Sequence, residues 1–177
     1  MKTNCHPSTE YQLTTRKCKM KPKLYVLVGI VGAGKSTWIA KQPFDWTRTI
    51  IASTDNHVEK YAKEQGKTYS DVFQDYMPTA VKNMANDVAD AVKHGYDIIW
   101  DQTSTTVNTR AKKLRMVPNT YEKIAVVFPT PDAKELSRRL ASRPGKNIPQ
   151  DVVNRMLRDF TMPTESEGFD RIITVDK

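Results

Sequence analysis

The loop at residues 29–36 constrains the fold of this 177-residue chain more than any other segment. Its sequence, Gly-Ile-Val-Gly-Ala-Gly-Lys-Ser, satisfies the pattern G-x-x-x-x-G-K-[ST] in full. An apolar run at 24–28 precedes the loop, and a helix-compatible stretch at 35–41 follows it. Glycines in such a loop let backbone N–H groups close around phosphate oxygens, and the N-terminus of the next helix adds a positive dipole. The sequence therefore predicts a nucleotide site at this strand-to-helix turn.

The rest of the chain alternates short apolar segments with helical patterns. Four further segments, at 49–52, 97–100, 124–128 and 171–175, share the continuous apolar character of 24–28. Such runs are typical of parallel strands that are covered on both faces. Together they predict an α/β domain with a P-loop NTPase fold, in which a five-stranded parallel sheet carries helices on both faces.

Charge separates a short leader, residues 1–22, from the predicted domain at 23–177. The chain carries a formal net charge of +8, and residues 1–23 hold six basic residues against one acidic residue. Because it has few apolar residues, the leader is expected to be flexible. Two interpretations of it stay open, a clamp for a nucleic-acid backbone and a solubilising tail. Its cysteines, Cys5 and Cys18, are expected to be unpaired thiols.

Composition excludes several classes of protein. Apolar residues make up 38% of the chain and charged residues 27%, as in soluble globular proteins. No apolar run approaches the roughly 18 residues of a membrane span. The N-terminus also lacks the apolar core of a secretory signal. We therefore expect a cytoplasmic protein with no membrane partner.

Two carboxylates directly follow predicted strands. Asp55 comes after the strand at 49–52, and Asp101 after the strand at 97–100. Ligands of doubly wound sheets gather at the carboxyl ends of the strands, which is where both side chains lie. Asp55 is a candidate general base for an attacking hydroxyl, with helix capping as the alternative. Asp101 is a candidate ligand of Mg²⁺, with a turn role at the strand end as the alternative.

Cations are predicted to close over the phosphates. Lys35 is expected to reach the β- and γ-phosphates, and Ser36 to offer its hydroxyl to Mg²⁺. The basic connector at 142–148, between two predicted helices, is a candidate lid, and Arg143 at its start is a candidate catalytic residue with Lys35 and Asp55. The predicted nucleotide-binding residues are Gly29, Gly32, Ala33, Gly34, Lys35, Ser36, Thr37, Arg139 and Arg143.

A second basic group follows the third predicted strand. It consists of Arg110, Lys112, Lys113 and Arg115. These side chains could line a groove for an acceptor and contact its phosphates, or they could form a solvated helix face.

These motifs together resemble the kinase domain of phage polynucleotide kinase. The resemblance covers most of residues 23–160 and rests on the P-loop through Trp38 and on segments 53–55, 101–103 and 139–149. That family transfers the γ-phosphate of ATP to a 5′-hydroxyl end of DNA or RNA. The resemblance therefore implies a phage-encoded nucleic acid repair enzyme that uses ATP and Mg²⁺ in the host cytoplasm.

The resemblance also implies a role for each matching position. Lys35 and Ser36 match the family's phosphate and magnesium residues. Asp55 matches its general base, and Asp101 its second active-site carboxylate. Arg139 and Arg143 match its lid arginines, which gives the same set of residues as the motif analysis.

The chain departs from the family in three places. The family's arginine three residues after the base, which binds the phosphate of the acceptor, is replaced by Val58, for which His57 or Lys60 could substitute. The family's usual Thr-Asn after the third strand is Thr103-Ser104 here. The D-x-D-x-T motif of the accompanying phosphatase domain does not occur in the sequence, so no removal of 3′-phosphates is expected.

Two other functions stay open. The acceptor could be a hydroxymethylated base in DNA, a nucleoside or another small hydroxyl compound. Alternatively, the chain could bind ATP and nucleic acid without catalysis, because residues 100–110 and 160–170 also resemble the ATPase-like module of heterogeneous nuclear ribonucleoprotein U. Fold alone does not distinguish these functions.

Overall fold

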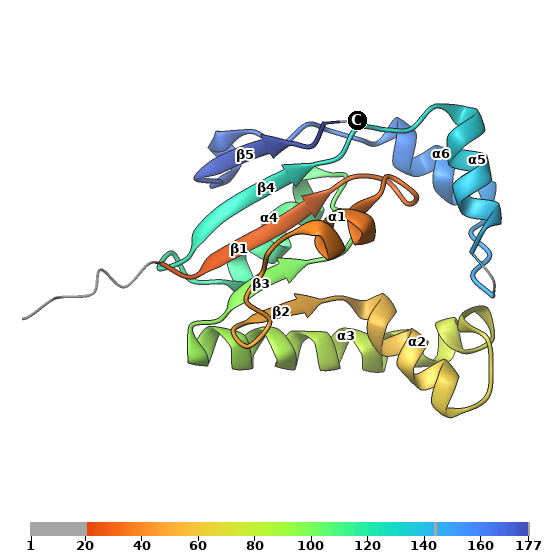
Figure 1. Ribbon diagram of the computed structural model, residues 1–177, viewed down its shortest axis with the longest axis horizontal. Helices are drawn as coiled ribbons and strands as arrows, with labels where there is room; N and C mark the ends of the chain where they lie inside the picture. Colours follow the sequence, from red (N-terminus) through yellow and green to blue (C-terminus); the bar gives the residue numbers. More distant parts are fainter. Residues whose placement is uncertain (1–20, 144, 177) are drawn as a thin grey trace, which may run out of the picture.

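Five parallel strands form one sheet at the centre of the structure (Figure 1). The computed structural model describes residues 21–143 and 145–176. In spatial order the strands are β2 (Thr49–Ala52), β3 (Asp97–Trp100), β1 (Lys23–Val28), β4 (Glu122–Val127) and β5 (Arg171–Thr174). Every neighbouring pair is parallel, and each strand begins and ends within two residues of its predicted segment. The predicted P-loop NTPase sheet is thus confirmed.

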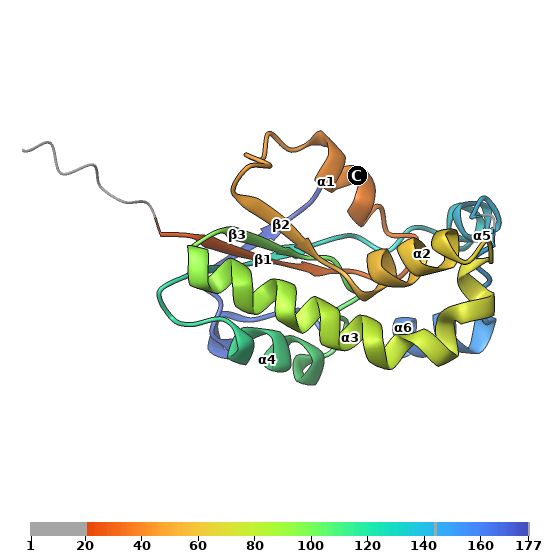
Figure 2. The same cartoon turned by 90° about the horizontal axis from the view of Figure 1, so that it is seen from below.

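Helices cover both faces of this sheet, as the sequence predicted. Figure 2 shows α1 (Lys35–Lys41) on one side and α3 (Tyr69–His94) with α4 (Val107–Met116) on the other. The helices α2 (Thr54–Glu64), α5 (Ala133–Ala141) and α6 (Gln150–Arg158) gather at the carboxyl ends of the strands (Figure 1). A short 3₁₀ helix, η1 (Glu165–Glu167), precedes β5.

The predicted leader, with Cys5 and Cys18, lies outside the described residues except for positions 21 and 22. Among the helices of the described part, none has both the length and the apolar character that crossing a bilayer requires.

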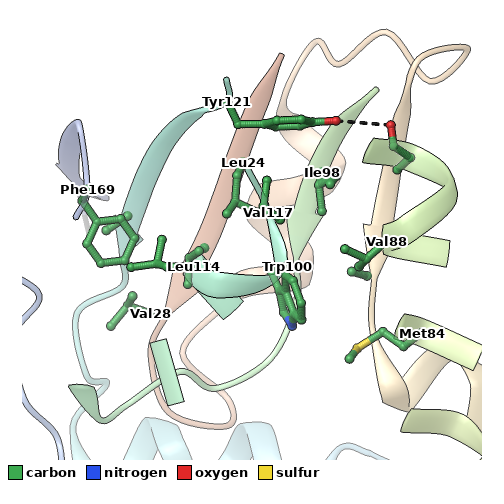
Figure 3. Packing of buried hydrophobic residues seen from close by; sticks show 14 of the residues in the cluster. Leu24, Val28, Met84, Val88, Ile98, Trp100, Leu114, Val117, Tyr121 and Phe169 are labelled. Atoms are coloured by element: carbon green, nitrogen blue, oxygen red, sulfur yellow. Dashed lines mark hydrogen bonds between the residues drawn. The ribbon is translucent and has the colours of Figure 1, made fainter. Parts of the chain in front are cut away.

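Separate apolar clusters fill the two faces of the sheet. On one face, Trp100 of β3 lies in a cluster with Met84 of α3 and Leu114 of α4 (Figure 3). On the other face, Ile39 of α1 and Leu136 of α5 belong to a second cluster. Burial of these side chains holds the helices against the sheet and so fixes the loops that follow the strands.

The helices α2 and α3 form a hairpin at the β2 edge of the sheet. A third apolar cluster, which includes Val58 of α2 and Val72 of α3, joins the two helices. Thr68 caps α3 through a capping box with Asp71, so this helix begins at a defined residue. The hairpin thereby brings Tyr69, the first residue of α3, to the N-terminus of α2, which follows the end of β2.

Candidate active site

The loop between β1 and α1 has the backbone shape of a phosphate cradle. Gly32 and Gly34 have φ angles of 77° and 100°, a left-handed conformation that favours glycine. Gly34 is also the N-cap of α1, so the loop passes directly into a helix N-terminus. A Cβ at Gly32 would lie only 2.8 Å from Cδ1 of Leu136 on α5. The glycines of the motif are therefore required by backbone conformation and by close approach, and the loop fits a triphosphate.

The Lys35 ammonium turns back onto this loop. Its Nζ donates to the carbonyl of Ile30 at 2.9 Å and to that of Gly29 at 3.3 Å. Burial lowers the pKa of Lys35 to about 8, and the nearby Asp101 carboxylate opposes this shift. A charged ammonium is thus held among the backbone groups that would surround a phosphate.

One cavity of about 880 Å³ contains nearly all of the predicted site residues. Asp55 and Asp101 line it from the strand ends, and Arg139 and Arg143 line it from the candidate lid. The P-loop supplies Gly32, Ala33, Gly34, Lys35, Ser36 and Thr37 to the same wall. Gly29 lies off this wall, where its N–H donates to the carbonyl of Thr103 at 3.0 Å and supports the loop. The cavity has the size of a site for a nucleotide.

The predicted Mg²⁺ ligands are oxygen atoms at the edge of the P-loop. Ser36 lies in the first turn of α1, and Asp101 follows β3, where its N–H donates to the carbonyl of Ala52 at 3.0 Å. Burial raises the pKa of the Asp101 carboxyl, against the opposing charge of Lys35. A hydroxyl and a carboxylate suit Mg²⁺, which keeps several waters and usually binds one or two protein groups together with substrate phosphates.

Asp55 does not cap the helix that begins beside it. The N-cap of α2 is Ser53, whose Oγ accepts the N–H of Asn56 at 3.4 Å. The Asp55 carboxylate instead accepts from the Tyr69 hydroxyl at 2.9 Å through Oδ1 and from the Lys146 ammonium at 2.5 Å through Oδ2. Its side chain is 45% exposed. The capping alternative is therefore excluded, and the carboxylate remains open to the cavity.

Three residues around Asp55 form a network. Lys146 belongs to the predicted lid, whereas the sequence analysis did not assign Tyr69 and Glu59 to the site. Lys146 also binds Glu59 at 3.2 Å, and its ammonium lies 4.1 Å from the centre of the Tyr69 ring. Burial raises the pKa of Tyr69, and the Asp55 charge raises it further, so the phenol stays protonated as a donor. Tyr69 carries no motif signal, because only the packing of α2 against α3 places it here.

The candidate lid contacts both sides of the cavity. On the nucleotide side, Arg139 Nη1 donates to the carbonyl of Gly32 at 2.9 Å. On the opposite side, Gly145 O accepts from the N–H and from the hydroxyl of Ser70, each at 3.2 Å, and the Asn147 N–H donates to the same hydroxyl at 3.3 Å. Arg139 at the end of α5 and the connector that follows this helix thus span together from the P-loop to the α2–α3 hairpin.

The four basic residues after β3 were expected to line an acceptor groove or to form a solvated helix face, and two of them do neither. Arg110 is fully buried and forms a bidentate pair with Glu167, both bonds at 2.7 Å. Lys113 is also buried, with its ammonium 6.0 Å from the centre of the Trp100 ring. These two charges serve the packing of α4, and neither lines the large cavity.

The replacement of the family's arginine also has a structural explanation. Val58 is fully buried in the cluster between α2 and α3. His57, one of the two suggested substitutes, pairs with Asp87 of α3 at 2.7 Å. Lys60, the other, is exposed on α2. Position 58 therefore faces α3 rather than the cavity.

The chain matches a known protein family and is similar in structure to several kinases. The model of the AAA domain family matches residues 24–163. A putative kinase from Chloroflexus aurantiacus j-10-fl has a TM-score of 0.62 at 19% identity and covers 89% of this chain and 86% of its own. Shikimate kinase from Acinetobacter baumannii, in complex with shikimate, has a TM-score of 0.50 at 15% identity, over 88% and 84% of the two chains.

A third similar structure belongs to an RNA repair complex. A chain of the Pnkp1/Rnl/Hen1 complex has a TM-score of 0.60 at 19% identity over 81% of this chain. The present chain spans less than half, 45%, of that chain's length. At these identities the likeness shows a shared kinase-like P-loop fold.

Proposed function

The chain belongs to the AAA domain family, and on that premise we propose that it is an ATP-dependent polynucleotide kinase. In this proposal residues 23–177 form a kinase domain that transfers the γ-phosphate of ATP to a 5′-hydroxyl end of DNA or RNA. The observation that carries the proposal is the single cavity that the P-loop and the Asp55 carboxylate both line. A phosphate donor on the loop and a hydroxyl at Asp55 would meet there.

The proposed step needs one base and two cations. Asp55 takes the proton of the acceptor hydroxyl while the hydroxyl oxygen forms a bond to the γ-phosphorus. The bond from that phosphorus to the β,γ-bridging oxygen breaks, and ADP leaves with the electron pair. Lys35 and Arg143 stabilise the negative charge on the transferred group. The proton on Asp55 then passes to solvent, to which the side chain is open.

ATP and Mg²⁺ are the ligands that the donor side fits. The P-loop amides and Thr37 surround the phosphates, with Gly29 supporting the loop and Arg139 covering it. Ser36 and Asp101 supply oxygen ligands for Mg²⁺. When it is bound, the ion neutralises charge on the phosphates.

Three features support a nucleic-acid acceptor. The sequence resembles polynucleotide kinase at each matching position of the donor side, the base and the lid. The formal net charge of +8 favours a polyanionic partner. One structure of the same fold belongs to an RNA repair complex.

A small hydroxyl compound is the second candidate acceptor. The observation in its favour is the pair of carboxylates at the acceptor side, Asp55 and Glu59, which both bind Lys146. An uncharged acceptor would enter beside these groups without electrostatic repulsion. Shikimate kinase, which has the same fold, is named for a small compound with hydroxyl groups, although that compound carries a carboxylate.

One labelling experiment tests these candidates. The protein is incubated with γ-labelled ATP, Mg²⁺ and, in separate reactions, a 5′-hydroxyl oligonucleotide, its 5′-phosphorylated form, hydroxymethyl-base DNA and free nucleosides. Label on the 5′-hydroxyl oligonucleotide alone is the expected result. Label on nucleosides would move the acceptor to the second candidate. Label on the hydroxymethyl-base DNA would keep a nucleic-acid acceptor but move the transfer from its 5′ end to the base. ATP binding with no label on any acceptor would overturn the kinase and favour a binding module.

A further inference from the structure

Lys146 is almost enclosed although it carries a charge. Its side chain is 8% exposed, and its ammonium contacts the carboxylates of Asp55 and Glu59 and the face of Tyr69. Two negative charges thus share one positive charge. The group beside the candidate base keeps an excess of negative charge.

This excess matters for a nucleic-acid acceptor. In a strand with a 5′-hydroxyl, a phosphodiester follows the first nucleoside. Binding of the hydroxyl at Asp55 therefore brings a phosphate near Asp55 and Glu59. Like charges at such short distances repel. The acceptor side needs a cation that can turn from the carboxylates to this phosphate.

The residues that the sequence offered on α2 do not meet this need. Val58 is buried against α3, and His57 is occupied by Asp87. Lys60 is exposed to solvent. Among the described residues, Lys146 is the cation that contacts the Asp55 carboxylate.

We propose that Lys146 is the residue that binds the phosphate of the acceptor strand. When the strand enters, the ammonium exchanges its bonds to Asp55 and Glu59 for bonds to the phosphodiester oxygens. The exchange replaces the two charge-assisted hydrogen bonds to carboxylates with bonds of the same kind to the phosphate. It also frees Oδ2 of Asp55 to accept the proton of the acceptor hydroxyl. The inference rests on the proposed function and names the residue that recognises its substrate class.

The position of Lys146 in the chain suits such an exchange. It lies in the connector between α5 and α6, outside any helix or strand. Its neighbours Gly145 and Asn147 form hydrogen bonds to the α2–α3 hairpin. Within the described part of the chain, all of these bonds go to one residue, Ser70. A small shift of this segment is therefore enough to move the ammonium. Because Arg143 belongs to the same connector and Arg139 lies on α5 just before it, the acceptor and the nucleotide would be covered together.

The test uses two acceptors that differ in one charge. One is a short 5′-hydroxyl oligonucleotide, and the other is the same oligonucleotide with an uncharged methylphosphonate as its first linkage. Transfer of label from ATP gives kcat/KM for each acceptor with the wild-type protein and with Lys146→Met, Lys146→Arg and Lys82→Met. Lys82, exposed on α3, is the control that removes the same charge elsewhere.

The wild type is expected to prefer the charged linkage by about tenfold or more, as for a charge-assisted contact. Lys146→Met should lose the preference, Lys146→Arg should keep most of it, and Lys82→Met should keep all of it. A wild type that uses both acceptors equally would overturn the inference without any variant. A preference that survives in Lys146→Met would also overturn it, and in both cases the polynucleotide kinase would stand. If the wild type labels neither acceptor, the proposed function fails and the inference fails with it.

Discussion

Arg139 of α5 is bonded directly to the P-loop: its Nη1 donates to the carbonyl of Gly32 at 2.9 Å. Its Nε donates to Glu135, one turn earlier in the same helix, at 2.7 Å. The bonds to arginine hold the pKa of Glu135 down at about 2, so this partner is a carboxylate at any ordinary pH. The guanidinium is therefore fixed above the phosphate cradle before a nucleotide binds.

We expect Arg139→Met to weaken ATP binding by about tenfold, because one charge-assisted contact to the phosphate region is lost. The measurement is titration of the protein with ATP by calorimetry at constant salt. Lys134→Met is the matched control, since Lys134 is an exposed cation on the same helix and is not among the residues that line the cavity. Equal losses in the two variants would contradict a specific role for Arg139.

Asp55→Asn separates phosphate transfer from ATP binding. The amide keeps the shape of the carboxylate but cannot accept the hydroxyl proton, so transfer should fall by about a hundredfold or more. ATP affinity should stay close to that of the wild type, because the residue lies on the acceptor side. Asp75→Asn, at an exposed position on α3, serves as the control. A variant at position 55 that still transfers phosphate at a near-normal rate would show that another group is the base.

The sequence predicted the elements of the fold well because its strongest signals are local. Continuous apolar runs located the strands, and the P-loop motif fixed the first turn. Apolar residues recur at helical spacing over 81–92, which predicts a buried stripe on one helix face. Met84 is buried as this spacing predicts, whereas Val81 is 47% exposed. That residue is turned to solvent by the packing of α3, which periodicity describes only on average.

The acceptor side could not be predicted in the same way. Asp55 follows a strand, and in this fold class ligands bind at the carboxyl ends of the strands. Tyr69 and Lys146, by contrast, are 14 and 91 residues away from Asp55 in the sequence. Val58 stands at the position of the family's phosphate-binding arginine, but its side chain is buried in the cluster between α2 and α3. Residues that meet only through packing between helices leave no spacing pattern to detect. The same reason explains why the sequence analysis, which left a groove and a solvated helix face open, did not predict the burial of Arg110 and Lys113.

Lys113 makes the stability of the protein depend on pH. Burial lowers its pKa from 10.5 to about 8, so the folded protein loses this proton before the unfolded chain does. Between about pH 8 and 10.5 the unfolded chain binds more protons, and stability contributed by this site rises with pH. Lys113→Met should therefore be more stable than the wild type at pH 7, by about 3 kcal/mol at most.

Urea unfolding at pH 7 and pH 10 measures this effect. The difference between the wild type and Lys113→Met should shrink at the higher pH, where the buried lysine is neutral. Lys112→Met removes a charge at the next, exposed position and should show no such change. A difference that is the same at both pH values would mean that packing, and not charge, explains the result.

Arg110 connects the loop after β3 to the segment between α6 and β5. Besides its pair with Glu167, its Nη1 donates to the carbonyls of Ser104 at 3.1 Å and Thr161 at 2.9 Å. Ser104 has a φ of 45°, unusual for a residue other than glycine, and it lies three residues after Asp101. The buried guanidinium thus holds a strained segment that begins at a candidate metal ligand.

Removal of one member of this buried pair should be costly, since the other charge is left without a partner. We expect Arg110→Met to lower the free energy of unfolding by about 3–5 kcal/mol. In the double variant with Glu167→Gln, the loss should be clearly smaller than the sum of the two single losses, because the unpaired carboxylate is gone. Urea unfolding of the four proteins gives this cycle, with Arg115→Met, exposed on the same helix, as a control expected to change stability by less than about 0.5 kcal/mol. Strictly additive losses would show that the two residues act separately and that the pair does not hold the loop.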